Sequence, residues 1–202
     1  MQIRNLHRMG GASNCYLVSE GRDAVIIDPS TSAETVTDLL SQAGLTLHAI
    51  LLTHGHFDHI LSLDTLRTAT GVPAYLHRGD AAFPGDAAKN CYLTLIGRDI
   101  RHRPAEHLLD GDETLEFGAL RFTVLHTPGH TEGCVCYRCG DALFTGDTLF
   151  AEGYGRTDLP GGNFTALRQS LSMLAAMQNE TLTIYPGHGA PADLADAIAM
   201  LY

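Results

Sequence analysis

Four side chains of metal-ligand type fall within six positions of this chain, in the segment THGHFDH that spans residues 53–59. The segment follows HAILL, a short continuous apolar run that is typical of a buried strand. His54 and His56 are two residues apart, so their imidazoles leave an extended backbone on the same side. Asp58 and His59 follow at the expected start of a helix, from which they can reach a neighbouring point. This spacing predicts a metal centre at the end of a buried strand.

Three later segments each place one potential metal ligand just after an apolar strand. They read TPGHT, TGDT and YPGHG, and their potential ligands are His130, Asp147 and His188. The glycine in each turn lets the backbone bend tightly and leaves the following side chain exposed. Because functional sites gather at strand ends along one edge of a sheet, we expect these side chains to join the first segment. Each of them alone is also explained as a hydrogen-bonded turn residue, and it is the four segments together that favour one shared site.

Strands and helices are expected in groups rather than in simple alternation. We expect strands over residues 15–18, 24–28, 48–52, 73–76, 114–117, 120–126, 134–138, 142–145 and 182–185, and helices over 32–43, 58–70, 164–177 and 192–201. Residues 79–104 show no clear pattern. Two packed sheets with helices outside fit this grouping better than a βαβ repeat. A hydrophobic fraction of 45%, with no internal repeat or linker, predicts a single domain over residues 1–202.

The charge of the chain argues against two classes of partner. With a net charge of −10 and no run of Lys or Arg, we expect binding neither to nucleic acid nor to a membrane, and a small-molecule substrate instead. The first ten residues lack the apolar stretch of about 7–15 residues that a signal peptide needs. No apolar run approaches the roughly 20 residues that cross a bilayer. We therefore expect a cytoplasmic protein. The sequence indicates no particular oligomeric state.

Five cysteines in a chain without an expected export signal predict free thiols. Cys134, Cys136 and Cys139 are spaced closely enough to suggest a metal knuckle. The segment has no nearby fourth ligand, and it reads as a strand with Cys134 and Cys136 on one face. We favour packing over metal binding for these thiols.

The combined pattern H-x-H-x-D-H, a histidine after Pro-Gly, an aspartate in GDTLF and a final Pro-Gly-His resembles the metallo-β-lactamase superfamily over residues 54–188. The resemblance implies a four-layer αββα sandwich of the α/β (α+β) class, with two divalent ions at one edge between the sheets. It implies two ligand sets and a bridge: His54, His56 and His130 for one ion, Asp58, His59 and His188 for the other, and Asp147 between them. Zinc is expected first, and iron or manganese also suit these ligands.

Within the superfamily the chain is most similar to glyoxalase II (hydroxyacylglutathione hydrolase), in a short form without the C-terminal helical domain. The similarity lies in GDTLF and in Gly155-Arg156. It implies a thioesterase that cleaves S-acylglutathione, such as S-lactoylglutathione, by a metal-bound hydroxide, with Asp58 and Asp147 as catalytic residues. Arg156 is expected to hold the anionic substrate, with Tyr154 and Asp158 as further candidates, while a solvated loop arginine is the alternative.

Other functions remain open beside this one. Persulfide dioxygenases share the implied fold and hold one iron with residues matching His54, His130 and Asp147. The sequence PGHG at residues 186–189 looks more like that of the hydrolases, which ranks the dioxygenase second. A β-lactamase is disfavoured because those enzymes usually depart from the Asp58-His59 or Asp147 pattern, and a ribonuclease because no basic surface is visible. A metal-binding module without catalysis is the non-enzyme alternative.

Overall fold

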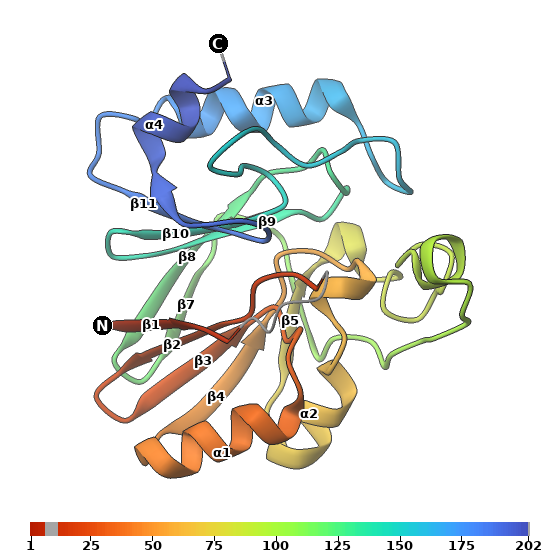
Figure 1. The fold of residues 1–202 in the computed structure, drawn as a ribbon, viewed down its shortest axis with the longest axis vertical. Coiled ribbons are helices and arrows are strands. Elements are labelled where there is room, and N and C mark those ends of the chain that lie inside the picture. The colour runs from red at the N-terminus through yellow and green to blue at the C-terminus, as the bar shows by residue number, and fades with distance from the viewer. Residues whose placement is uncertain (7–11, 202) are drawn as a thin grey trace.

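Two six-stranded sheets pack face to face, and helices cover both outer surfaces (Figure 1). This arrangement is seen in a computed structural model that describes residues 1–6 and 12–201. Residues 7–11, part of the segment in which no signal peptide is expected, lie outside the described residues. The order of layers in Figure 1 is helix, sheet, sheet, helix, which confirms the predicted αββα sandwich.

The first sheet follows the order of the chain. Its strands are β1 (Gln2–Asn5), β2 (Tyr16–Glu20), β3 (Asp23–Ile27), β4 (Thr46–Leu51), β5 (Ala74–His77) and β6 (His107–Leu109). Strands β1 to β3 pair antiparallel, whereas β3 to β6 pair parallel. The edge strands β1 and β6 were not predicted, because both are short and mostly exposed and lack an apolar alternation.

The second sheet is mainly antiparallel. Its strands are β7 (Thr114–Phe117), β8 (Leu120–His126), β9 (Val135–Cys139), β10 (Ala142–Gly146), β11 (Thr183–Pro186) and β12 (Ala192–Asp193). Only β10 and β11 pair parallel, across the connection that carries helix α3 (Phe164–Ala175). All five cysteines are free and buried, in agreement with the predicted free thiols.

Apolar side chains fill all three interfaces between the layers. Alternate residues of β3 pack into two of these interfaces. Val25 and Ile27 face the other sheet, while Ala24 and Ile26 face the helices. A strand covered on both faces needs an almost continuous apolar sequence, which is what β3 and β4 have. The strands are therefore held rigidly, and their ends fix the segments that follow them.

Four α-helices of the described part of the chain form the outer layers. They are α1 (Ala33–Ala43), α2 (Leu63–Thr70), α3 (Phe164–Ala175) and α4 (Leu194–Ala199). Ser32 caps α1 by accepting the N–H of Thr35 at 3.2 Å, and Gly44 ends it in the left-handed conformation. In the described ranges, 1–6 and 12–201, no helix is both long and apolar enough to cross a membrane.

The helix predicted from residue 58 to 70 is wrong at its beginning. A short 3₁₀ turn, η1 (Phe57–His59), comes first, and the α-helix begins only at Leu63. The carbonyl of Asp58 accepts the Ser13 hydroxyl at 3.0 Å instead of the N–H of Ser62. That N–H bonds to the Pro29 carbonyl at 2.9 Å, so the helical ladder is broken here.

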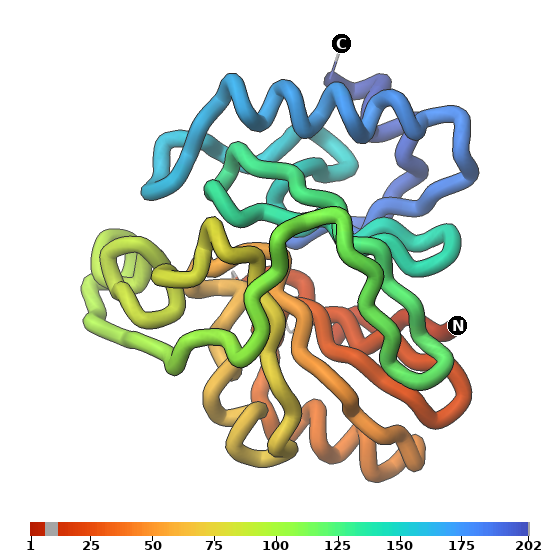
Figure 2. Tube along the Cα trace, turned by 180° about the vertical axis from the view of Figure 1, so that it is seen from behind, coloured from red at the N-terminus to blue at the C-terminus, as the bar shows by residue number. Residues whose placement is uncertain are grey.

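The segment over residues 79–104 projects from the side of the sandwich (Figures 1 and 2). It contains most of the 3₁₀ turn η2 (Arg78–Asp80) and a π-helical turn, η3 (Tyr92–Ile96). Cys91 precedes η3 with a φ of 68°, a left-handed conformation that is uncommon for a residue with a side chain. The projecting segment stands beside the strand ends that carry the candidate ligands.

Candidate metal centre

Seven potential ligands converge at one edge of the sandwich, between the two sheets. His54 and His56 follow β4 of the first sheet, and Asp58 and His59 lie in η1. The second sheet contributes the rest from the ends of β8, β10 and β11: His130, Asp147 and His188. Three sets have ligand atoms within 4.8 Å of one another: His54, His56 and His130; His54, His59 and Asp147; and Asp58, His59 and His188. The four segments singled out in the sequence therefore meet in space.

Asp147 lies between the two outer sets. Its Oδ1 is 3.3 Å from Nε2 of His59, and its Oδ2 is 3.5 Å from Nε2 of both His130 and His188. Within the first set, His56 Nδ1 is 2.8 Å from His130 Nε2. The two carboxylate oxygens thus face different histidines, which is the arrangement that a bridging ligand requires.

Buried polar atoms of the cluster fit a metal ion. Among the described residues, Nε2 of His54, His56 and His59 and Oδ1 of Asp147 are buried without any hydrogen-bond partner. A buried polar atom without a partner costs about 1–3 kcal/mol, and four at one point would be a large penalty. Imidazole nitrogens and carboxylate oxygens are ligands for zinc, iron and manganese, so divalent cations would satisfy all four.

The electrostatics of the cluster keep two imidazoles neutral. Burial, together with the neighbouring histidines, lowers the pKa of His54 well below its usual value and that of His56 to about 3. A neutral imidazole offers a lone pair to a cation. Burial acts to raise the pKa of Asp147, but His59, His130 and His188 outweigh it and hold the pKa below its usual range. The carboxylate is therefore ionised and available as a ligand.

Two ligand rings are oriented by hydrogen bonds on their far side. Nδ1 of His59 lies 2.8 Å from Asp28, and Nδ1 of His130 lies 2.7 Å from the carbonyl of Arg156. A proton on each Nδ1 leaves Nε2 free to face the cluster. Asp28 also accepts the N–H and hydroxyl of Thr53, at 2.8 and 2.7 Å, which ties it to the ligand segment. Asp28 was not among the predicted site residues, because its sequence context indicates only the end of a strand.

A second buried carboxylate, Asp80, joins two of the ligand segments. Its oxygens accept the N–H of Gly55 at 2.9 Å, the N–H of Gly133 at 2.8 Å and the hydroxyl of Thr131 at 2.8 Å. Gly55 lies between the first two histidines, and Thr131 follows His130 directly. Asp80 thus fixes the distance between segments from different sheets. It lies in the region without a sequence pattern, so nothing in the sequence marked it.

Replacing Asp80 by asparagine is expected to weaken metal binding about 10- to 100-fold, the usual cost of losing an outer partner of a ligand segment. An amide has a single acceptor oxygen, and its NH₂ would face a backbone donor. Competition with a chelator measures the affinity. The matched control is Asp86→Asn in the same segment, whose side chain accepts the N–H groups of Ala88 and Lys89. Equal affinities of the two variants would show that Asp80 does not position the ligands.

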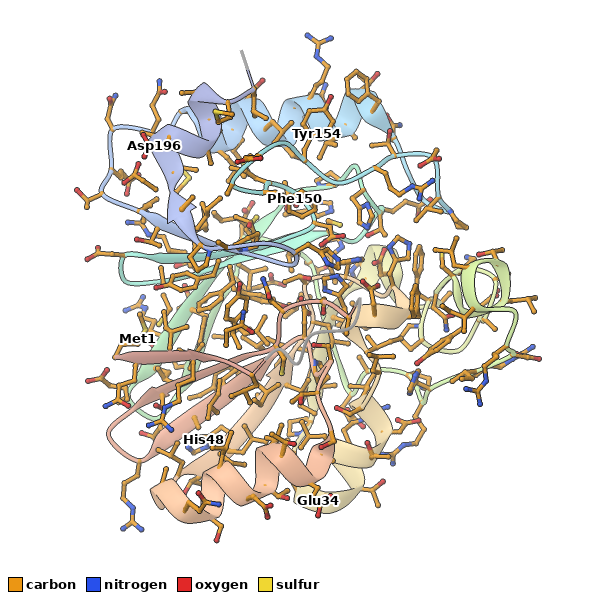
Figure 3. The ribbon with its side chains drawn as sticks, viewed as in Figure 1. Met1, Glu34, His48, Phe150, Tyr154 and Asp196 are labelled. Atoms are coloured by element: carbon orange, nitrogen blue, oxygen red, sulfur yellow. The ribbon has the colours of Figure 1, made fainter. Side chains whose placement is uncertain are left out.

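A cavity of about 420 Å³ opens directly onto the cluster. Arg156 lines it, and its guanidinium is paired with Asp158 through contacts of 2.6 and 2.7 Å. Asp158 therefore holds the arginine rather than lining the cavity itself. The structure places Tyr154 outside the cavity, 43% exposed and packed on Phe164 of α3 with a ring separation of 6.1 Å (Figure 3). Of the three predicted substrate-binding residues, only Arg156 lines the site.

Comparisons with known proteins agree with this geometry. The family described as the metallo-beta-lactamase superfamily matches residues 8–188. A relative from Bacillus subtilis, named probable metallo-hydrolase YqgX, is 38% identical over 184 residues, which cover 90% of this chain and 87% of the relative. The family match thus includes every candidate ligand.

Solved structures with the same fold include three that cover nearly all of this chain. BLEG-1, described as a B3 metallo-beta-lactamase, has a TM-score of 0.87 and 36% identity, covering 98% of this chain and 97% of its own. TTHA1623, solved in a di-iron-bound form, has a TM-score of 0.80 and 35% identity, covering 97% and 96%. ETHE1 from Myxococcus xanthus has a TM-score of 0.74 and 29% identity, covering 97% and 81%.

Proposed function

This chain belongs to the metallo-beta-lactamase superfamily, and from that premise we propose that it is a two-metal hydrolase that cleaves thioesters of the S-acylglutathione type. The observation that carries the proposal is the position of Asp147, whose two oxygens face histidines of both outer ligand sets. The similar structure of TTHA1623 in a di-iron-bound form supports a pair of ions.

In this proposal the outer ligand sets hold one ion each, and Asp147 bridges them. His54, His56 and His130 would hold the first ion, and Asp58, His59 and His188 would hold the second. Ions held there would supply a hydroxide nucleophile at neutral pH and would stabilise negative charge on the carbonyl oxygen. Asp28 keeps the His59 ring turned toward the site through its bond to Nδ1.

The chain supplies no covalent nucleophile in this proposal. Cys91 lines the cavity, but burial raises the pKa of its thiol, which leaves it a poor nucleophile at neutral pH. A thiol leaving group has a pKa near 8.5, so it departs as a thiolate without a general acid. Thioesters therefore suit a site whose side chains bind metal rather than transfer protons.

Arg156 is assigned to the anionic part of the thiol. The Nε and one terminal nitrogen of Arg156 bind Asp158, which leaves the other terminal nitrogen of the guanidinium to bind a carboxylate. We expect Arg156→Ala to raise KM for S-lactoylglutathione about tenfold, since a hydrogen bond to a charged group contributes about 1.5–3 kcal/mol and Asp158 already shares this one. Steady-state kinetics measure it, with an uncharged N-acetylcysteamine thioester as the control substrate. The same rise in KM for both substrates would contradict the assignment of Arg156 to the anionic part of the thiol.

Turnover assays on the metal-loaded protein test the proposed function. We expect release of the thiol from S-lactoylglutathione, followed with a thiol reagent. Because BLEG-1 is described as a metallo-beta-lactamase, the opening of a β-lactam ring is the rival hydrolysis, and a chromogenic cephalosporin measures it.

The second candidate, a one-iron persulfide dioxygenase, would use His54, His130 and Asp147, of which His130 and Asp147 lie 3.5 Å apart. Oxygen uptake with glutathione persulfide and no thioester cleavage would replace our proposal with it.

A further inference from the structure

The cavity next to the metal centre has an apolar wall facing its polar floor. The floor consists of candidate ligands: His56, Asp58, His130, Asp147 and His188. The side chains of the wall are almost all apolar: Phe57, Cys91, Leu95, Phe150 and Leu159, with Arg156 as the one charged member. A substrate carbonyl at the floor therefore has its substituents against hydrocarbon on most sides.

Two aromatic rings of the wall are fixed beside the ligands. Phe57 lies between two ligands in the sequence, and its ring packs on Tyr92 of η3 with a centroid separation of 5.3 Å. The ring of Phe150 lies 6.0 Å from that of His188, at an interplanar angle of 85°. Both rings are thus held close to where a carbonyl carbon would react, independently of the substrate (Figure 3 labels Phe150).

The outer part of the wall comes from the projecting segment. Leu95 of η3 lines the cavity and is 50% exposed. Leu93 and Ile96 of the same turn are 49% and 47% exposed, so the turn presents apolar side chains that its own fold leaves uncovered. A ligand that covers Leu95 removes apolar surface from water on both sides of the contact, which favours binding.

Polar partners for a hydroxylated acyl group are missing from this wall. Among the residues described as lining the cavity, the only polar side chains are the candidate ligands, the Cys91 thiol and Arg156. Arg156 is engaged by Asp158 and is assigned to the thiol carrier. The hydroxyl of a lactoyl group would therefore lose water without gaining a dedicated partner, which costs binding free energy.

We propose that the preferred substrates are thioesters of apolar acyl groups, aliphatic or aromatic, and that Leu95 on η3 selects them. The inference rests on the proposed function and narrows its substrate class. Water adds its oxygen to the acyl carbon, the carbon–sulfur bond breaks, and the products are the carboxylic acid and the free thiol. The acyl chain lies along the wall formed by Phe57, Leu95 and Phe150.

A series of S-acylglutathiones tests the proposal on the metal-loaded protein. The acyl groups are acetyl, butanoyl, hexanoyl and octanoyl, with D-lactoyl as the hydroxylated member. We expect kcat/KM to rise about threefold for each added methylene until the wall is covered, because each buried methylene contributes favourable transfer free energy. Hexanoyl is expected to exceed lactoyl about tenfold or more. Values of kcat/KM that stay level or fall with chain length would overturn the proposal.

The chain offers a matched pair of variants on one turn. Leu95→Ser is expected to lower the hexanoyl-to-acetyl ratio of kcat/KM about fivefold or more, since Leu95 lines the cavity. Leu93→Ser changes an equally exposed leucine that does not line the cavity, and should leave the ratio as in the wild type. Equal hexanoyl-to-acetyl ratios in both variants would contradict the proposed role of Leu95 in selecting the acyl group. Absence of cleavage of every thioester contradicts the proposed function itself, whereas cleavage of all members at one rate contradicts only the apolar preference.

Discussion

Asp147→Ala is expected to lower kcat/KM for thioester hydrolysis by at least about three orders of magnitude, on the order of 4 kcal/mol of transition-state stabilisation. The two oxygens of this carboxylate face both outer ligand sets, at 3.3 Å from His59 and 3.5 Å from His130 and His188. Its removal takes away the negative charge that faces both ligand sets and would attract both cations. Both ions are then held more weakly, and their spacing is no longer fixed.

Kinetics and metal content of the same preparation separate the causes of this loss. We expect the Asp147 variant to retain less than one ion per chain after dialysis and to remain folded by circular dichroism. Asp38→Ala, which removes an exposed carboxylate from α1, serves as the control and should match the wild type. Full activity of Asp147→Ala would contradict the bridging role.

Gly187→Ala is the second change with a large expected effect. A Cβ at this position would overlap Oδ1 of Asp147 and come within 2.7 Å of Cε1 of His59. The position also donates its N–H to the Gly146 carbonyl at 2.7 Å, so the backbone has little freedom to move away. The methyl group must therefore displace the bridge or a ligand. We expect metal affinity to fall at least about 100-fold, because ligand geometry is lost.

The comparison for Gly187 is a glycine where a methyl group has room. A Cβ at Gly85 would meet nothing closer than 3.9 Å, and Gly85→Ala should bind metal as the wild type does. Chelator competition measures both affinities. A Gly187→Ala variant with wild-type affinity would mean that the ligands sit farther from this turn than the structure places them.

The sequence predicted the sandwich and the ligand cluster for the same physical reason. Each of the four ligand segments follows an apolar strand, and buried strands carry a strong pattern. Once the strands are placed, their ends must lie along an edge of a sheet. His54, His130, Asp147 and His188 could thus be grouped without knowing how the sheets pack.

Residues that act through distant partners could not be predicted in this way. Asp80 contacts Gly55 and Gly133, which are 25 and 53 positions away in the chain, and it lies in a turn without periodicity. The break between η1 and α2 depends on carbonyl and hydroxyl groups near residues 13 and 29, which no local pattern of residues 58–70 reveals. Contacts between separate segments decide these features, and they appear only when the fold is known.

The position of Tyr154 illustrates the same limit for the substrate site. Its place in a glycine-rich loop beside Arg156 suggested that both residues face the substrate, yet the loop turns between them. Tyr154 packs on α3, whereas Arg156 reaches the cavity. The apolar wall likewise combines residues of η1, η3 and two loops, so its chemistry is set by packing rather than by any single segment.

Metal content per chain, determined by plasma mass spectrometry on protein saturated with zinc or iron and then dialysed, tests the two-ion centre most directly. We predict two ions per chain in the wild type. A value of one would contradict the bridging assignment of Asp147 and favour the one-iron alternative. A value near zero would contradict the metal centre as a whole, because the seven side chains would then converge without binding a cation.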